Sequence, residues 1–74
     1  MSARSLTIGR LAESAGVNLE TVRYYERIGL VRPRARSESG YRLYDDDSVE
    51  RLAFIGRAKR LGMSLDDVAT LIEA

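Results

Sequence analysis

Hydrophobic residues in the first part of the chain recur with the spacing of a short helix. The i, i+3, i+4, i+7 pattern of one apolar helix face is formed by Ile8, Leu11, Ala12 and Ala15. Thr7 is placed to cap the start of this helix, and Gly16 can supply the left-handed residue that ends it. The pattern therefore predicts a helix between residues 7 and 16.

A second helix is predicted immediately after this glycine. Asn18 is a good N-cap, and Val17 and Val22 have the spacing of a hydrophobic staple. A helical wheel divides the residues into an inner group of Leu19, Val22 and Tyr25 and an outer group of Glu20, Arg23, Tyr24 and Arg27. Two helices joined by a tight turn are typical of a helix-turn-helix, which we place at about residues 7–28.

The next segment has the pattern of a short hairpin, or wing, at about residues 31–44. Arg32-Pro33 favours extended backbone, residues 37–40 have turn chemistry, and "YRLY" alternates as a strand does. The loop of this hairpin is rich in arginine and serine. The wing is expected to present this basic loop beside the second helix.

Two supporting helices are predicted in the remaining residues, at about 46–61 and 65–73. The three aspartates at 45–47 are signals of a helix N-terminus, and Ser64 with Asp67 forms a near capping box for the last helix. The last helix has one apolar stripe, which we expect to leave apolar surface near its end: Leu65, Val68, Leu71 and Ile72. The predicted fold is mainly α, a winged helix-turn-helix of four helices with a small β-hairpin wing, forming a single domain over residues 1–74.

Composition limits the chemistry that this chain can perform. It has 74 residues with neither histidine nor cysteine, so the usual neutral-pH acid–base group and thiolate metal ligands are absent. No glycine-rich phosphate loop or placeable carboxylate pair is found. We therefore expect no enzyme activity, no cofactor and no metal site. No apolar run approaches the length of a membrane span, so we expect a soluble, cytoplasmic protein without a membrane partner.

The net charge of +1 conceals strong segregation. Residues 21–44 contain six arginines and carry +4, whereas residues 45–50 carry −4. Arginine suits phosphates and guanine edges through its planar fork, and a tyrosine hydroxyl can donate to a phosphate. This pattern favours DNA binding. Two alternatives stay open: a solvated helix face on which Arg23 pairs with Glu20 or Glu26, and a helical interaction module that docks on an acidic protein.

The aromatic residues are assigned by their place in the pattern. Tyr25, Tyr41 and Tyr44 are expected to pack in the core, because aromatic residues brace small domains, whereas Tyr24 faces outward. A second basic cluster, at residues 57–60, has two interpretations: a solvated helix face, or a phosphate contact, because it lies beside a glycine and a helix N-terminus.

The stretches "LTIGRLAESAGVNLETVRYYERIGLV" and "SGYRLYDDDSVERLAFIGRAKRLGMSLDDVATLI" resemble the N-terminal DNA-binding domain of the MerR family of bacterial transcription regulators. The resemblance covers residues 6 to 72 or so, and "TVRYYERIGL" followed by "GYRLY" is its most specific part. It implies a winged helix-turn-helix that binds promoter DNA as a homodimer, bends and untwists the spacer between polymerase-recognition elements, and meets RNA polymerase there. It also implies association with the nucleoid.

The same resemblance implies roles for individual residues. Arg23 and Tyr24 would contact bases or backbone in the major groove, Arg42 would contact phosphate from the wing, and Arg60 would contact backbone near the operator centre. Together with the pattern of charge, it gives a predicted DNA-binding set: Thr21, Arg23, Tyr24, Arg27, Arg34, Arg36, Tyr41, Arg42 and Arg60. Within this set, Arg34 and Arg36 are expected on a mobile part of the loop and should matter less. An alternative role for Arg42 is a surface ion pair with a carboxylate such as Asp45.

The sequence departs from the family pattern in one respect. Family members continue beyond the fourth helix into a long helix that pairs with its twin, followed by an effector-binding segment, whereas this sequence ends at Ala74. For these residues alone we expect a mostly monomeric state off DNA and pairing on adjacent half-sites. The departure is consistent with an excised DNA-binding domain or with a naturally short, DNA-architectural relative that lacks effector sensing.

Overall fold

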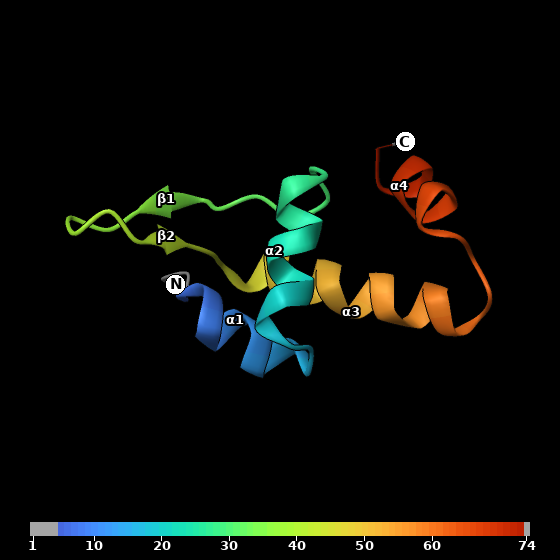
Figure 1. Cartoon of the computed structure of the whole chain (residues 1–74), viewed down its shortest axis with the longest axis horizontal. Helices are drawn as coiled ribbons and strands as arrows, with labels where there is room; N and C mark the ends of the chain where they lie inside the picture. Colours follow the sequence, from blue (N-terminus) through green and yellow to red (C-terminus); the bar gives the residue numbers. More distant parts are fainter. Residues whose placement is uncertain (1–4, 74) are drawn as a thin grey trace.

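The computed structural model describes residues 5–73 and contains helices with one two-stranded antiparallel hairpin. In chain order the elements are α1 (Ile8–Ala15), α2 (Leu19–Arg27), β1 (Ala35–Arg36), β2 (Arg42–Leu43), α3 (Asp46–Arg60) and α4 (Leu65–Glu73). In Figure 1, α2 stands at the centre, the hairpin extends to one side, and α3 leads to α4 on the other. The predicted winged helix-turn-helix is confirmed.

The ends of the first two helices are set by local chemistry. The Thr7 side chain accepts a hydrogen bond from the Arg10 amide, and Gly16 ends α1 with a φ of 72°, in the left-handed region. The Asn18 Oδ1 then accepts from the Thr21 amide at 2.8 Å and from the Thr21 hydroxyl at 2.9 Å. The three predicted caps are therefore confirmed.

The Asn18 cap gives a first testable prediction. We expect Asn18→Ala to lower the free energy of unfolding by about 0.5–2 kcal/mol, because the Thr21 amide in the first turn of α2 loses its acceptor. Chemical denaturation of both proteins measures this difference. Ser14→Ala is the control, since Ser14 is exposed within α1 and caps no helix. Equal losses in the two variants would contradict the capping role.

The wing is tied to the start of the described chain. β1 and β2 pair in the register Ala35↔Leu43 and Arg36↔Arg42. Just beyond β2, Tyr44 forms an antiparallel bridge with Leu6, in which each amide donates to the other residue's carbonyl at 2.7 Å. The base of the wing is therefore anchored beside the start of α1 by two backbone hydrogen bonds, a contact that the sequence pattern did not predict.

Two hydrophobic clusters share α3. One buried cluster lies where α1, α2 and α3 meet: Leu6, Leu11, Ala12, Val22, Val31, Tyr44 and Leu52. The other holds α4: Leu30, Ile55, Ala58 and Val68. Tyr25 packs against both clusters. Because α3 contributes to each, it joins the helix-turn-helix to α4.

The apolar stripe predicted for α4 is only partly buried in the core. Val68 is fully buried, and Leu65 and Ile72 pack against the second cluster. Leu71 is 52% exposed, so the expectation of apolar surface near the end of this helix is confirmed for this residue. Among the described residues, the most exposed large apolar side chain is Leu61, which follows α3 directly.

Candidate nucleic-acid interface

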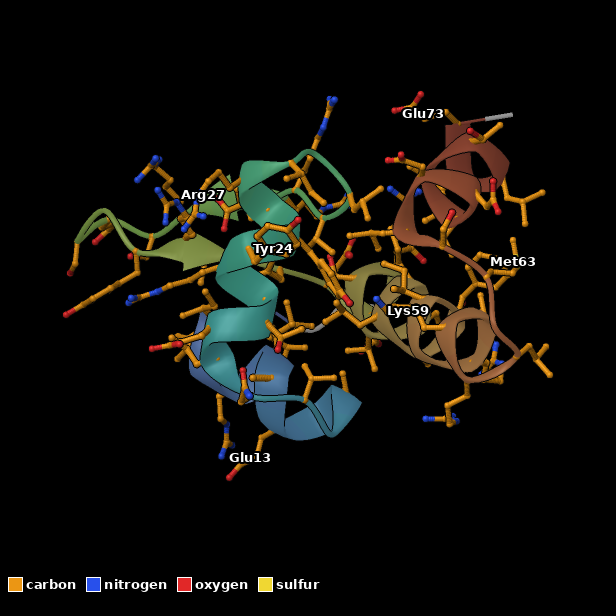
Figure 2. The ribbon with its side chains drawn as sticks, turned by 45° about the vertical axis from the view of Figure 1, so that its right-hand side comes forward. Glu13, Tyr24, Arg27, Lys59, Met63 and Glu73 are labelled. Carbon is orange, nitrogen blue, oxygen red and sulfur yellow. The ribbon has the colours of Figure 1, made fainter. Side chains whose placement is uncertain are left out.

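The outer face of α2 is exposed, as the helical wheel predicts. Val22 is fully buried on the inner side, with Leu19 and Tyr25 partly buried beside it. The outer side chains are all exposed: Glu20, Arg23, Tyr24 and Arg27. Figure 2 shows Tyr24 on the outer side of α2 and Arg27 toward the wing. This face combines cationic forks with a phenol that reaches solvent, both of which can donate to phosphates or base edges.

The wing brings further cations beside this helix. Arg23 of α2, Arg36 of β1 and Arg42 of β2 line one hollow of about 260 Å³, together with Tyr41 and the start of α1 at Thr7 and Ile8. We call the exposed basic and aromatic residues on α2 and the hairpin the α2–wing surface: Arg23, Tyr24, Arg27, Arg36, Tyr41 and Arg42. Guanidiniums from three elements converge here, so the surface suits a polyanion.

The structure corrects the assignment of Tyr41. This side chain is 66% exposed and lines the hollow, so the prediction that it packs in the core is wrong. It follows the hairpin turn, and the residues that line the hollow with it leave most of its side chain in solvent. Tyr44, only 1% exposed, and the partly buried Tyr25 do pack in the core, as predicted. Tyr24 is 45% exposed, which confirms its outward position.

The alternative predicted for Arg42, an ion pair with a carboxylate, is observed, but the partner is not Asp45. The Arg42 Nε lies 3.1 Å from Oε2 of Glu26 on α2. Asp45 is paired instead with Arg34, whose Nη1 lies 3.0 Å from Oδ2. Among residues 5–73 no ion pair includes Arg23, so the predicted alternative of a pair with Glu20 or Glu26 is not observed.

Arg36 is a strand residue and not a loop residue as predicted, whereas Arg34 lies in the connection just before β1. Arg36 belongs to β1, and its Nη1 donates to the Gly40 carbonyl across the turn at 3.1 Å. The Arg34 amide donates to the Leu43 carbonyl just before β1, and its side chain turns toward Asp45. The structure brings Arg36 onto the α2–wing surface, whereas Arg34 lines a separate hollow beside Asp45.

Two other predicted site residues lie apart from this surface. Arg60 is the exposed last residue of α3, which Figure 1 shows running away from the wing. Its guanidinium lies beside Gly56, one turn earlier in α3. The Arg60 Nη1 is 3.9 Å from the point where a Cβ atom on that glycine would stand. Thr21 is partly buried in the first turn of α2, and its hydroxyl donates to Asn18. The structure therefore does not bring these two residues together with the hollow.

Glu26 connects α2 to the wing, a role that the sequence did not predict. Its Oε1 accepts the hydroxyl of Tyr44, while its Oε2 holds Arg42. Burial, followed by the hydrogen bond to this carboxylate, raises the pKa of the Tyr44 phenol above its ordinary value. The sequence does contain a signal that these two side chains could share a partner. Arg42 and Tyr44 are two residues apart in an alternating strand, so they lie on the same face.

Other kinds of site are not seen in the described part of the chain. Within residues 5–73, no group of three or more carboxylate side chains is arranged to hold a metal ion. None of the helices in that range combines the length and the apolar character needed to cross a bilayer.

Comparison with known proteins places this geometry in a family. The family model described as "MerR HTH family regulatory protein" matches residues 6–74. A mercuric resistance operon regulatory protein from Bacillus cereus is 49% identical over 65 residues, which cover 88% of this chain and 49% of that protein. The chain spans about half the length of the curated relatives that it matches.

Solved structures agree with this match over nearly the whole chain. HiNmlR, a MerR family regulator lacking the sensor domain and bound to promoter DNA, superposes with a TM-score of 0.85 at 31% identity, over 95% of this chain and 53% of that one. A transcription regulator from Ralstonia metallidurans in complex with lead(II) gives 0.83 at 41% identity, over 92% and 53%. Family model, relative and structures agree: the chain belongs to the MerR family of helix-turn-helix regulatory proteins.

Proposed function

We propose that this chain binds double-stranded DNA in a sequence-specific manner and does so as part of a transcription regulator. The observation that supports this proposal best is the α2–wing surface, where arginines from α2, β1 and β2 line one hollow beside an exposed helix face. An α-helix fits the major groove of B-DNA, and arginine is the commonest reader of guanine there. In this arrangement α2 reads base edges, and the wing contacts the neighbouring phosphates.

The wider activity is proposed from the family. One similar protein is described as a MerR family regulator bound to promoter DNA. We propose that this chain pairs with a second copy on adjacent half-sites, that the pair bends and untwists the promoter spacer, and that RNA polymerase then engages the realigned elements. A regulator of this kind works in the bacterial cytoplasm, on the nucleoid.

The proposal can be tested without knowing the operator. A random duplex library is bound by the purified chain, and the retained DNA is sequenced and then measured by electrophoretic mobility shift. We expect an enriched motif, and tighter binding to it than to a scrambled duplex of the same composition. Recovery of unenriched sequences with equal affinities would contradict sequence-specific binding. Binding to acidic protein but not to any duplex would favour an interaction module instead.

The wing gives a second prediction, which concerns the origin of affinity. Each phosphate neutralised by an arginine releases condensed counterions and contributes a slope of about −0.9 in log affinity against log salt. We expect Arg42→Ala to weaken binding similarly on selected and scrambled duplexes, and to make the slope shallower by roughly one unit. Arg60→Ala should do the same, since the end of α3 is proposed to contact backbone near the operator centre.

The matched control for this prediction is Arg10→Ala. Arg10 is exposed on α1, pairs with Glu13 at 3.8 Å and lies outside the α2–wing surface. Its replacement removes the same charge and should leave the slope nearly unchanged. Titrations at several salt concentrations measure all the slopes. Parallel lines for wild type and Arg42→Ala would remove the wing from the binding surface.

A further inference from the structure

Glu26 stands between the two parts of the α2–wing surface. It lies in the last turn of α2, and its side chain is only 18% exposed. Both oxygens of its carboxylate are used by the segment around β2, since Oε1 accepts from the Tyr44 hydroxyl and Oε2 is paired with Arg42. One acidic group therefore joins α2 to the wing through two neighbouring side chains of the same strand face.

Tyr44 supplies the fixed point of this arrangement. Its side chain is 1% exposed in the first hydrophobic cluster, and its backbone is held by both hydrogen bonds to Leu6. Because Tyr44 is fixed in the core, its hydroxyl holds the Glu26 carboxylate in one place. The position of Glu26 is therefore set by the core, although it acts at the surface.

Arg42 is held through one nitrogen, and the rest of its fork remains available. The contact with Glu26 uses Nε, which leaves the terminal amino groups with their N–H donors. The Arg42 side chain is 48% exposed and lines two hollows that also contain Arg23. Because the arginine end of this ion pair is half exposed, solvent screens the pair and its contribution to stability is modest. Its larger effect is to fix the direction of a long and otherwise flexible side chain.

We propose that Glu26 is a positioning residue, whose carboxylate holds Arg42 against α2 so that the terminal amino groups of the arginine meet a DNA phosphate beside Arg23. The inference rests on the proposed DNA binding and adds how the wing and the recognition helix act as one unit. A phosphate contact from Arg42 on the wing, made beside the base contact proposed for Arg23 on α2, fixes the helix in a single register on the duplex.

If Glu26 acts only through its charge, its removal should change DNA affinity in the opposite direction, so the two roles can be distinguished by experiment. Removing an acidic group beside a DNA-binding surface should strengthen binding to a polyanion if no positioning is involved. Glu26→Gln removes the charge and keeps an oxygen that can accept from Tyr44. We expect this variant to bind the library-selected duplex about fivefold more weakly or worse, a loss within the usual coupling of residues in contact. Its salt slope should become shallower by about one unit, as for Arg42→Ala.

A double variant and a matched control complete this experiment. In the Arg42→Ala background, Glu26→Gln should cause no further loss, because the side chain that it positions is gone. Glu13→Gln changes the net charge equally on α1, where Glu13 is exposed, pairs with Arg10 and lies outside the α2–wing surface, and it should change affinity little. Circular dichroism and the stoichiometrically determined active fraction establish that each protein is folded. A purely structural role would lower the active fraction without altering the slope.

Glu26→Asp covers the case in which the amide variant does not fold. The shorter side chain keeps the charge but cannot reach Tyr44 and Arg42 together, so we expect weaker binding at unchanged net charge. Binding by either folded variant as tight as that of wild type would overturn the positioning role while leaving DNA binding intact. If wild type binds neither the selected nor the scrambled duplex, the proposed function itself is wrong, and the positioning role falls with it.

Discussion

Arg23→Ala is expected to lower affinity for the selected operator by roughly 1–3 kcal/mol and to relax sequence preference at one base-pair position. Arg23 lies on the exposed face of α2, takes part in no ion pair among residues 5–73, and lines the hollow shared with Arg36 and Arg42. Its fork is thus available to two acceptors on one guanine. Competition binding against duplexes that vary each operator position measures the effect.

Arg23→Lys is the matched variant for this prediction. Lysine keeps the charge but lacks the planar fork that pairs with the two guanine acceptors. We expect it to retain most affinity for a scrambled duplex and to lose much of the discrimination shown by wild type. If Arg23→Ala weakens binding to operator and scrambled DNA equally, Arg23 contacts backbone, and the assignment to base reading is wrong.

Leu11→Ala is expected to have the largest effect on stability, about 2–5 kcal/mol. Leu11 is fully buried in the cluster where α1 meets α2 and α3, and its truncation leaves a cavity there. At about 0.05–0.15 kcal/mol per residue, a chain of this size has a total stability not far above that loss. Thermal unfolding should show a decrease of roughly 10 °C or more in Tm.

Leu61→Ala provides the same chemical change at the surface. Leu61 is 84% exposed after the end of α3, so its truncation should alter the free energy of unfolding by no more than about 0.5 kcal/mol. Comparable destabilisation by the two variants would show that Leu61 is covered in solution. A small effect of Leu11→Ala would show that the first cluster can close around the missing side chain.

The features that sequence predicts best here are decided within one or two helical turns. Thr7, Gly16 and Asn18 occupy the predicted cap positions, because a side-chain acceptor or a left-handed residue acts on amides and carbonyls close to it in the chain. The outer face of α2 follows from helical periodicity in the same way. The general location of the basic surface was therefore predictable.

The features that sequence failed to predict depend on contacts between distant residues. The Leu6–Tyr44 bridge and the pair of Glu26 with Arg42 arise only once the hairpin is placed against α1 and α2. The exposure of Tyr41 has the same origin, since an alternating strand pattern does not say whether a second layer covers its face. Charge complementarity suggested that Arg42 would have a partner, but the fold selected which carboxylate it meets.

The Leu6–Tyr44 bridge also decides where a fused protein would emerge. Because Leu6 is paired to the base of the wing, a polypeptide joined ahead of it leaves beside β2, close to the α2–wing surface. Figure 1 shows α4 at the opposite end of the molecule, so a fusion after α4 leaves far from that surface. A bulky N-terminal fluorescent reporter is therefore expected to interfere sterically with ligands of the wing, whereas the same reporter after α4 should be tolerated.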